Sequence, residues 1–257
     1  MLTIPTSKDC FLHGRNDKEF LYWRWKPHKC ELPRFELSTF FQIMREKRLA
    51  FIGDSVARNQ MESLLCILSQ EEAPIDVYKD AKDRSRTWFF PRNNFTLMVL
   101  WTRFLVKGVE REGGVYDFHL DQVDEKWGYN VSQGLVDYAI VSSAQWYFRK
   151  NYLFEGHCER SKPYDEENLL ISSKNNDEWE VRDIQIEEIE RAKKEGYWKG
   201  QQNIQALDIT KVMLLRPDGH PGSHWRDKKK KGFNDCVHWC MPGPIDVWND
   251  LLLALLN

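Results

Sequence analysis

The sequence predicts an α/β fold in which helices cover both faces of a parallel sheet. Short apolar segments of strand length alternate along the 257-residue chain with segments whose apolar residues recur at helical spacing, a pattern typical of this fold class. A chain of this length can bury one sizeable core, or one core with a subsidiary lobe. Charge is balanced, with 37 basic and 39 acidic residues, so nothing indicates a nucleic-acid partner.

The first predicted elements are a strand, a tight turn and a helix. Residues 48–52 form a short apolar run, Gly53-Asp54-Ser55 ends it, and residues 56–68 show helical periodicity. A shorter helix over residues 38–45, N-capped by Ser38, precedes this unit. The serine of the turn therefore lies where a strand passes into a helix.

Later segments complete the predicted sheet. Phe95–Trp101 and residues 136–142 are expected strands, and the second is apolar enough to be buried on both faces. Residues 180–194 form a charged helix, residues 203–209 a further strand, and the tail 243–257 ends in an amphipathic helix. The alternation calls for one more strand between residues 151 and 203, but most of that sequence is polar.

Cysteine usage favours an oxidising, secretory compartment. Six cysteines are widely spaced, which suits disulfides better than a compact metal site. Two N-glycosylation triplets begin at Asn94 and Asn130. The sequence shows no signal peptide and no apolar run that could span a membrane. Either the chain is cytosolic or its N-terminal targeting segment is missing, and we expect the second.

Ser55 is the first candidate for chemistry. It follows a predicted strand at the carboxyl end, where open α/β sheets bind their ligands. Its backbone N–H lies at a helix N-terminus, where an oxyanion is stabilised. The same Gly-Asp-Ser tripeptide also makes an ordinary turn and helix N-cap, so both interpretations stay open at this point.

The candidate base is His238, with Asp235 three residues before it. This spacing lets the carboxylate accept a hydrogen bond from one ring nitrogen while the other faces a nucleophile, and a serine hydroxyl needs such a base at neutral pH. The alternatives are a structural histidine between disulfide cysteines, or a zinc site formed by Cys236, His238 and Cys240, with or without Cys158. Because Cys-x-His-x-Cys is not a usual zinc spacing, we expect no metal.

Together these segments resemble a known family. GDSVARNQ at 53–60, followed by NDCVHWCMPGPID at 234–246, is similar to the plant trichome-birefringence-like proteins, which are polysaccharide O-acetyltransferases of the SGNH-hydrolase (PC-esterase) type. LYWRWKP at 21–27, CELPRF at 30–35 and LLRPDGHP at 214–221 agree with it. The resemblance runs along nearly the whole chain and is nearest to the branch that acts on xyloglucan.

The resemblance implies a domain organisation and a location. It implies a three-layer α/β/α catalytic domain over residues 47–257, preceded over residues 1–46 by part of a Trp- and Cys-rich lobe. It also implies a type II membrane protein of the Golgi lumen, although this chain contains no anchor. Family members carry several dozen further residues after the Trp146 loop, including a core strand. We therefore expect an internal deletion near residues 151–160.

The expected deletion bears on the site. Without the missing strand, the loop with Asp235 and His238 would have to move by about one strand spacing, ~5 Å, whereas a triad needs contacts of about 3 Å. The motifs are intact in the sequence, so the open question is whether they assemble in this chain.

The resemblance also assigns roles. Ser55 is the nucleophile, His238 the general base and Asp235 the residue that orients the base. Acetyl passes from a donor, acetyl-CoA or another acetyl compound, to Ser55 and then to a hydroxyl of a xyloglucan- or xylan-type polysaccharide, with no bound cofactor. The alternatives are a carbohydrate acetyl-esterase and an inactive, truncated glycan-binding remnant.

Other residues are candidates for substrate or oxyanion contacts. Arg58 and Asn59, one turn into the helix after Ser55, either reach the oxyanion or the donor, or make local salt bridges on the helix surface. Trp239 is either a sugar platform or a packing residue. The full set of these candidates is Gly53, Asp54, Arg58, Asn59, Gln145, Trp146 and Trp239.

Within the resemblance we also expect two disulfides. Cys10–Cys240 would tie the N-terminal lobe, and Cys158–Cys236 the middle segment, to the loop that carries the base. Cys30 and Cys66 would then be unpaired.

Overall fold

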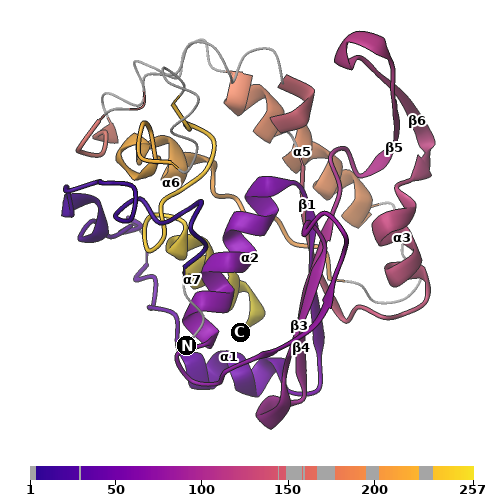
Figure 1. Ribbon diagram of the computed structural model, residues 1–257, viewed down its shortest axis with the longest axis horizontal. Coiled ribbons are helices and arrows are strands. Elements are labelled where there is room, and N and C mark those ends of the chain that lie inside the picture. Colours follow the sequence, from indigo (N-terminus) through magenta and orange to yellow (C-terminus); the bar gives the residue numbers. More distant parts are fainter. Residues whose placement is uncertain are drawn as a thin grey trace.

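A five-stranded sheet forms the centre of the protein (Figure 1). The computed structural model describes residues 4–28, 30–143, 145–148, 158, 160–166, 177–194, 203–225 and 234–257. The strands of the sheet are β1 Arg48–Gly53, β2 Ile75–Lys79, β3 Arg86–Phe90, β4 Phe95–Trp101 and β7 Tyr138–Ser142, in the order β2-β3-β4-β1-β7.

The α/β class is confirmed, but the sheet is mixed and not wholly parallel as predicted. β1 is parallel to both β4 and β7, whereas β3 is antiparallel to β2 and to β4. Only the short 3-10 helix η2 (Pro91–Asn93) and Asn94 separate β3 from β4. A connection this short makes a hairpin, because a parallel crossover needs a dozen or more residues.

Helices cover both faces of the sheet, as expected. α1 (Leu37–Met44), α2 (Ser55–Leu68) and α7 (Asp246–Leu256) pack on one face, against Leu49 and Phe51 of β1 and Leu97 and Val99 of β4. The alternate residues of β1 and β4 point to the other face, where Trp127 of α3 (Glu125–Ser132) packs on them. The remaining described helices are α5 (Asp177–Lys194), α6 (Thr210–Leu214) and the 3-10 turns η1 (Glu19–Leu21), η3 (Glu112–Gly114), η4 (Gln145–Phe148) and η6 (Pro217–Gly219).

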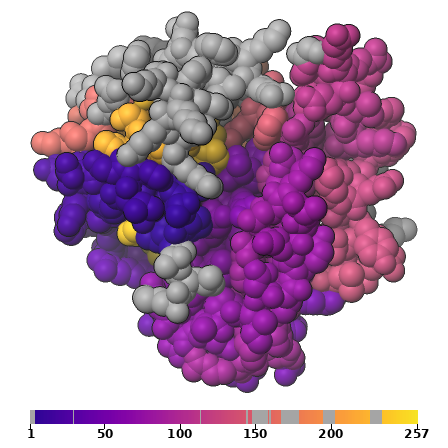
Figure 2. All heavy atoms as spheres, viewed as in Figure 1, coloured from indigo at the N-terminus to yellow at the C-terminus, as the bar shows by residue number. Residues whose placement is uncertain are grey.

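A separate hairpin extends beyond the sheet. β5 (Val106–Glu110) and β6 (Tyr116–Val123) pair antiparallel and join the end of β4 to α3 (Figure 1). Figure 2 shows this hairpin at the upper right, in magenta and pink, away from the N-terminal segment in indigo. No helix or strand with defined bounds was predicted from the sequence between residues 101 and 136.

Two expectations about strands are wrong. The strand predicted at 136–142 is present as β7, but Tyr138 is 37% and Val141 54% exposed, so it is not buried on both faces. The segment 203–209 forms no strand. Both have one physical reason: β7 ends the sheet, and no strand among the described residues pairs with its outer edge. A segment without such a neighbour has no ladder to join.

Gly53 permits the close approach of β7 to the end of β1. A Cβ at this position would lie 2.0 Å from the backbone oxygen of Ser142. We expect Gly53→Ala to lower the free energy of unfolding by about 3 kcal/mol, because backbone has to move, as measured by denaturant unfolding. Gly134→Ala is the matched control. Gly134 has positive φ but open space around it, so only about 1–2 kcal/mol is expected; equal losses would contradict a clash at Gly53.

Both expected disulfides are present. Cys10 is bonded to Cys240 and Cys158 to Cys236, while Cys30 and Cys66 are free thiols. The first bond fixes the N-terminal segment to the C-terminal part of the chain, and the backbone N–H of Met241 donates to the carbonyl of Lys8 (3.0 Å) beside it. No helix within the described ranges is long and apolar enough to cross a membrane.

Candidate active site

The turn after β1 presents Ser55 at the start of helix α2. Asp54 is the N-cap: its Oδ1 accepts a hydrogen bond from the backbone N–H of Val56 (2.8 Å). Asp54 is buried, and burial raises its pKa, although the hydrogen bond from Val56 and the charge of His238 act in the opposite direction. The first N–H groups of a helix have no partner within it, so the N–H of Ser55 can donate to an anion.

Asp235 and His238 form the hydrogen-bonded pair that their spacing predicts. Nδ1 of His238 donates to Oδ2 of Asp235 (2.9 Å). The backbone N–H groups of Val237 and His238 donate to Oδ1 at 3.1 and 3.0 Å. Burial alone would raise the pKa of Asp235, but the hydrogen bond from His238 and the nearby charges of His238 and Lys8 hold it well below its usual range. The carboxylate is therefore ionised and fixes which imidazole nitrogen carries the proton.

Backbone contacts hold the loop with this pair on both sides. Gly222 and Asp235 exchange two backbone hydrogen bonds (3.0 and 2.8 Å). The N–H of Trp239 donates to Oδ1 of Asn59 (2.8 Å), a residue with no exposed surface. Asn59 lies one helical turn after Ser55, on the same face of α2. The loop therefore reaches the nucleophile's helix even though no described strand separates β7 from residues 203–209.

Nε2 of His238 is the remaining polar atom of the pair. It is buried and has no hydrogen-bond partner among the described residues, so it is not hydrogen-bonded to the Ser55 hydroxyl. The loop is nevertheless attached to the nucleophile's helix, because Trp239, the residue after His238, donates to Asn59 of α2. The charge of His238 also acts to lower the pKa of Asp54. Catalytic hydrogen bonds are often long without substrate and tighten in the complex. Nε2 is thus available for a proton that arrives with the substrates.

The structure separates the two interpretations of Arg58 and Trp239. Arg58 makes local contacts: Nε donates to Glu62 (2.7 Å), and Nη1 to the carbonyl of Asp83. Trp239 is 6% exposed and its ring stacks on His220 with centroids 3.9 Å apart. The sugar-platform hypothesis for Trp239 is therefore wrong, because both its burial and this stacking deny its face to a ligand.

The candidates Gln145 and Trp146 lie at the same edge of the sheet. They begin η4, directly after β7, whose Ser142 pairs with Gly53. The indole of Trp146 packs edge-on against Trp101, with centroids 6.3 Å apart. Trp101 in turn pairs with Gly53 across β1 and β4, so the fold brings this loop and the nucleophile's turn together.

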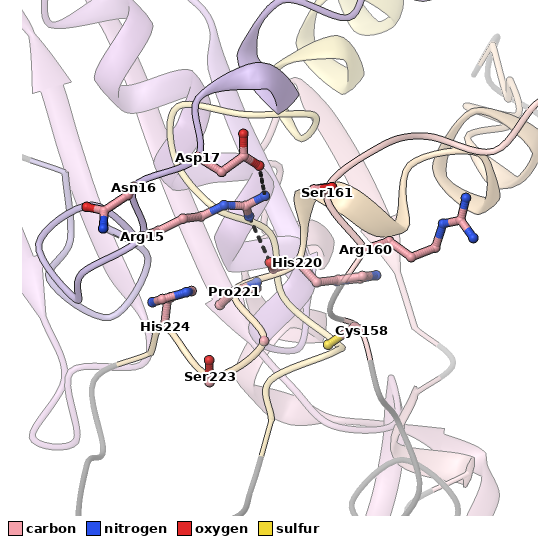
Figure 3. Close-up of a pocket in the computed structure, with 11 residues that line it drawn as sticks. Arg15, Asn16, Asp17, Cys158, Arg160, Ser161, His220, Pro221, Ser223 and His224 are labelled. Carbon is pink, nitrogen blue, oxygen red and sulfur yellow. Dashed lines mark hydrogen bonds and ion pairs between the residues drawn. The ribbon is translucent and has the colours of Figure 1, made fainter.

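Behind the loop that carries Asp235 and His238 lies a polar pocket of about 260 Å³ (Figure 3). Arg15 spans it, donating to Asp17 (3.2 Å) and to the carbonyl of His220 (3.1 Å). The ring of His220 then donates through Nδ1 to the carbonyl of His238 (2.8 Å). The pocket walls are therefore part of the scaffold behind the base. They are formed by Arg15, Asn16, Asp17, Cys158, Arg160, Ser161, His220, Pro221, Gly222, Ser223 and His224.

Lys8 is a charged group near the site that the sequence analysis missed. It is 8% exposed, and burial lowers its pKa to about 8 despite the opposing charges of Asp235 and Glu62. No motif marks this lysine. The available signal is its position two residues before Cys10, whose disulfide brings it to the loop of the base.

We expect Lys8→Met to raise the free energy of unfolding at pH 7 by roughly 1–3 kcal/mol. Below pH 8 the wild type must bury a charge. Between pH 8 and about 10.4 the unfolded chain binds more protons than the folded one, so wild-type stability rises with pH. The advantage of the variant should therefore shrink from pH 7 to pH 9.5 in urea titrations. Exposed Lys82 supplies the control, Lys82→Met; a constant advantage for Lys8→Met would contradict a buried ammonium group.

A zinc site at Cys236 and Cys240 is ruled out, because neither sulfur is free to bind a metal. Cys236 and Cys240 are both in disulfides. In the part of the chain that the structure describes, no three His, Cys, Asp or Glu side chains are grouped to hold a metal ion.

Comparisons with known proteins identify the family. A model of the PC-Esterase domain, the GDSL/SGNH-like acyl-esterase family found in Pmr5 and Cas1p, matches residues 32–157 and 153–255. The chain belongs to the PC-esterase family. The PMR5 N-terminal domain matches residues 2–31 of this PC-esterase chain.

Several relatives of this PC-esterase chain are named for an activity. Xyloglucan O-acetyltransferase 3 of Populus trichocarpa is 45% identical over 99% of this chain and 80% of its own length. Xyloglucan O-acetyltransferase 2 of Arabidopsis thaliana is 38% identical, over 99% and 77%. Protein trichome birefringence-like 24 of Arabidopsis thaliana is 35% identical, over 98% and 75%.

The relatives have more residues inside the matched region. The alignment with the poplar protein spans 324 positions, at least 67 more than the 257 residues of this chain. The two matches to the PC-esterase model overlap at residues 153–157. The deletion predicted near 151–160 stays a prediction, since of those residues only Cys158 and Arg160 lie within the described part.

Proposed function

We propose that this PC-esterase protein transfers acetyl groups to hydroxyls of a cell-wall polysaccharide of the xyloglucan type, through an acetyl-Ser55 intermediate. The observation that carries the proposal is the Asp235–His238 pair, which Trp239 and Asn59 fix beside the helix that Ser55 begins. The names of the relatives support the acetyl group and the xyloglucan acceptor.

In the first half of the reaction Ser55 takes the acetyl group. Its Oγ attacks the carbonyl carbon of the donor, acetyl-CoA or another acetyl compound, while Nε2 of His238 accepts the hydroxyl proton. The oxyanion is stabilised by the N–H of Ser55 at the start of α2. Nδ2 of Asn59 is a second donor, since it is buried and has no hydrogen-bond partner among the described residues. The proton then passes from His238 to the departing group of the donor.

In the second half the acceptor replaces the donor. Nε2 of His238 takes the proton of a sugar hydroxyl, and the oxygen attacks the acetyl carbon of acetyl-Ser55. Collapse of this intermediate breaks the bond to Ser55 Oγ, which recovers the proton from His238. Asp235 keeps Nδ1 protonated throughout. Water in the acceptor's place would give the acetyl-esterase reaction with the same residues.

The disulfides support a location in the secretory pathway. Two bonds join segments 230 and 78 residues apart in sequence, and such bonds persist in oxidising compartments and are rare in the cytosol. Together with relatives named for xyloglucan, this supports a secretory-pathway enzyme. Residence in the Golgi lumen and a type II membrane anchor form the finer part of the proposal.

The proposal is tested by incubating purified protein with an acetyl donor and an acceptor and detecting the products by mass. The donor is an activated acetyl ester or acetyl-CoA, and the acceptor is xyloglucan or xylan oligosaccharide. We expect acetylated xyloglucan oligosaccharide. Free acetate without acetylated sugar would show an esterase instead. Glycan binding with neither product would show a non-catalytic remnant. Acetylated xylan without acetylated xyloglucan would leave the transfer reaction and overturn the acceptor class.

A further inference from the structure

Aromatic side chains from three segments form one connected cluster at the carboxyl edge of the sheet. The ring of Phe104 is central: its centroid lies 4.9 Å from that of Tyr116, 4.8 Å from Phe118 and 5.3 Å from Tyr147. Trp146 packs edge-on against both Phe104 and Trp101. We call this the edge cluster, formed by Trp101, Phe104, Tyr116, Phe118, Trp146 and Tyr147.

The edge cluster is continuous with the nucleophile's turn. Trp101 is the residue of β4 that pairs with Gly53, two residues before Ser55. The N–H of the next residue, Thr102, donates to the carbonyl of Gly53 (2.8 Å). Neighbouring strands lie about 4.8 Å apart, so the cluster begins one strand away from the proposed acetyl carrier and extends from there onto the β5–β6 hairpin.

The cluster has a buried inner part and an exposed outer part. Trp101 and Phe104 are 8% and 4% exposed, whereas Phe118 and Tyr147 are 40% and 52% exposed. The hydroxyl of Tyr147 donates to the carbonyl of Phe104 (2.9 Å), which fixes its ring while leaving much of it in solvent. Two oriented aromatic rings at the surface, backed by a packed interior, are suited to stack on a planar apolar ligand face.

Charged side chains accompany the rings. The guanidinium of Arg84 lies 4.3 Å from the ring centroid of Trp101, and that of Arg103 lies 4.6 Å from Trp146. Arg103 also donates to Glu110 (3.2 Å), while its Nε has no hydrogen-bond partner in the described part of the chain. Sugar rings offer an apolar C–H face and many hydroxyls, so aromatic faces beside N–H donors and a carboxylate match their chemistry.

We propose that the edge cluster is a binding subsite for the acceptor glycan, in which Phe118 and Tyr147 stack on sugar rings several units away from the hydroxyl that is acetylated. The subsite rests on the proposed function for the identity of the chain it holds. With such a subsite the enzyme prefers polymeric acceptors, because a short oligosaccharide bound at Ser55 does not extend to the hairpin and lacks these stacking contacts.

The test uses Tyr147→Ala and Phe118→Ala with a short and a polymeric xyloglucan acceptor. We expect each variant to raise KM for the polymer about 5- to 10-fold, with no change in kcat, in KM for the short acceptor or in acetylation of Ser55 by donor alone. Tyr147→Phe keeps the ring and should retain most of the polymer affinity. Tyr78→Ala is the matched control, since Tyr78 is 55% exposed and lies on β2, outside the cluster.

Binding is measured separately in a Ser55→Ala background, by mobility in gels that contain xyloglucan. Slower migration that is relieved by Tyr147→Ala and not by Tyr78→Ala supports the subsite, even where no acetyl transfer is found. Equal retardation of all variants, or equal KM values for the polymer in an active enzyme, would overturn the subsite and leave the proposed function standing. If Tyr147→Ala abolished self-association of the protein and left glycan binding unchanged, the edge cluster would be a protein–protein contact. That result would also overturn the subsite.

Discussion

Replacing Ser55 by alanine is expected to lower the rate of acetyl transfer on the order of 10⁵-fold or more. The change removes the only atom proposed to carry the acetyl group. It leaves the backbone N–H at the start of α2 and the Asp54 cap in place, and alanine favours a helix. The free energy of unfolding should therefore change by less than about 1 kcal/mol, which denaturant unfolding of the same preparation checks.

The matched control for this variant is Ser38→Ala. Ser38 lies in α1, is exposed, and its hydroxyl donates only to the carboxylate of Glu36 among the contacts described, so full activity is expected. Transfer within tenfold of the wild-type rate in Ser55→Ala would contradict a covalent serine mechanism. Loss of activity together with a large loss of stability would assign Ser55 to folding.

Asp235→Asn is expected to lower kcat by about 10⁴-fold. Asparagine keeps one oxygen for the backbone N–H groups of Val237 and His238, but its NH₂ group then faces Nδ1 of His238. The imidazole must accept there, so its proton moves to Nε2 and the base can no longer take a proton from Ser55. The loop should stay in place, because the disulfides at Cys236 and Cys240 and the bond from Trp239 to Asn59 do not involve the Asp235 side chain.

The pH dependence of stability gives Asp235→Asn a second readout. The folded-state pKa of Asp235 is depressed, so its carboxylate stabilises the folded protein above the unfolded pKa of about 3.9. That contribution is lost as pH falls through the lower folded value. The stability gap between wild type and variant should thus be full at pH 6 and close in strong acid. Asp121→Asn, at an exposed position of β6, should alter neither rate nor gap.

Local patterns predicted the parts of the site that depend on neighbours in sequence. The continuous apolar run before Gly53 and the helical periodicity after Ser55 gave β1 and α2 within two residues. The Asp-x-x-His spacing predicted the contact between the carboxylate and the imidazole, because the four residues of one turn make that contact by themselves. The bond from Trp239 to Asn59 joins residues 180 positions apart, and no local pattern contains it.

The failures share a tertiary cause. β2 has a short Ile-Asp-Val alternation but is exposed at every position, so its pairing with β3 holds it and burial does not. The β5–β6 hairpin packs its rings on Phe104, and Phe118 also packs on Tyr147 of η4, contacts that no local pattern contains. The sequence of residues 203–209 predicts a strand. A strand needs a neighbouring strand to pair with, and the described residues provide none here. Lys8 is brought near Asp235 only by the folding of the chain, so no local pattern predicts it. Burial of Trp239 likewise follows from its stacking on His220.

The most direct test of Ser55 as the acetyl carrier is to mix the protein with donor alone, quench in acid and map the acetyl group by peptide mass spectrometry. We predict one acetyl group on the peptide that contains Ser55, its disappearance when xyloglucan oligosaccharide is added before the quench, and its absence in Asp235→Asn at the same early time. Acetyl on another residue, or acetylated sugar formed with Ser55 unmodified at every time point, would contradict the proposed mechanism.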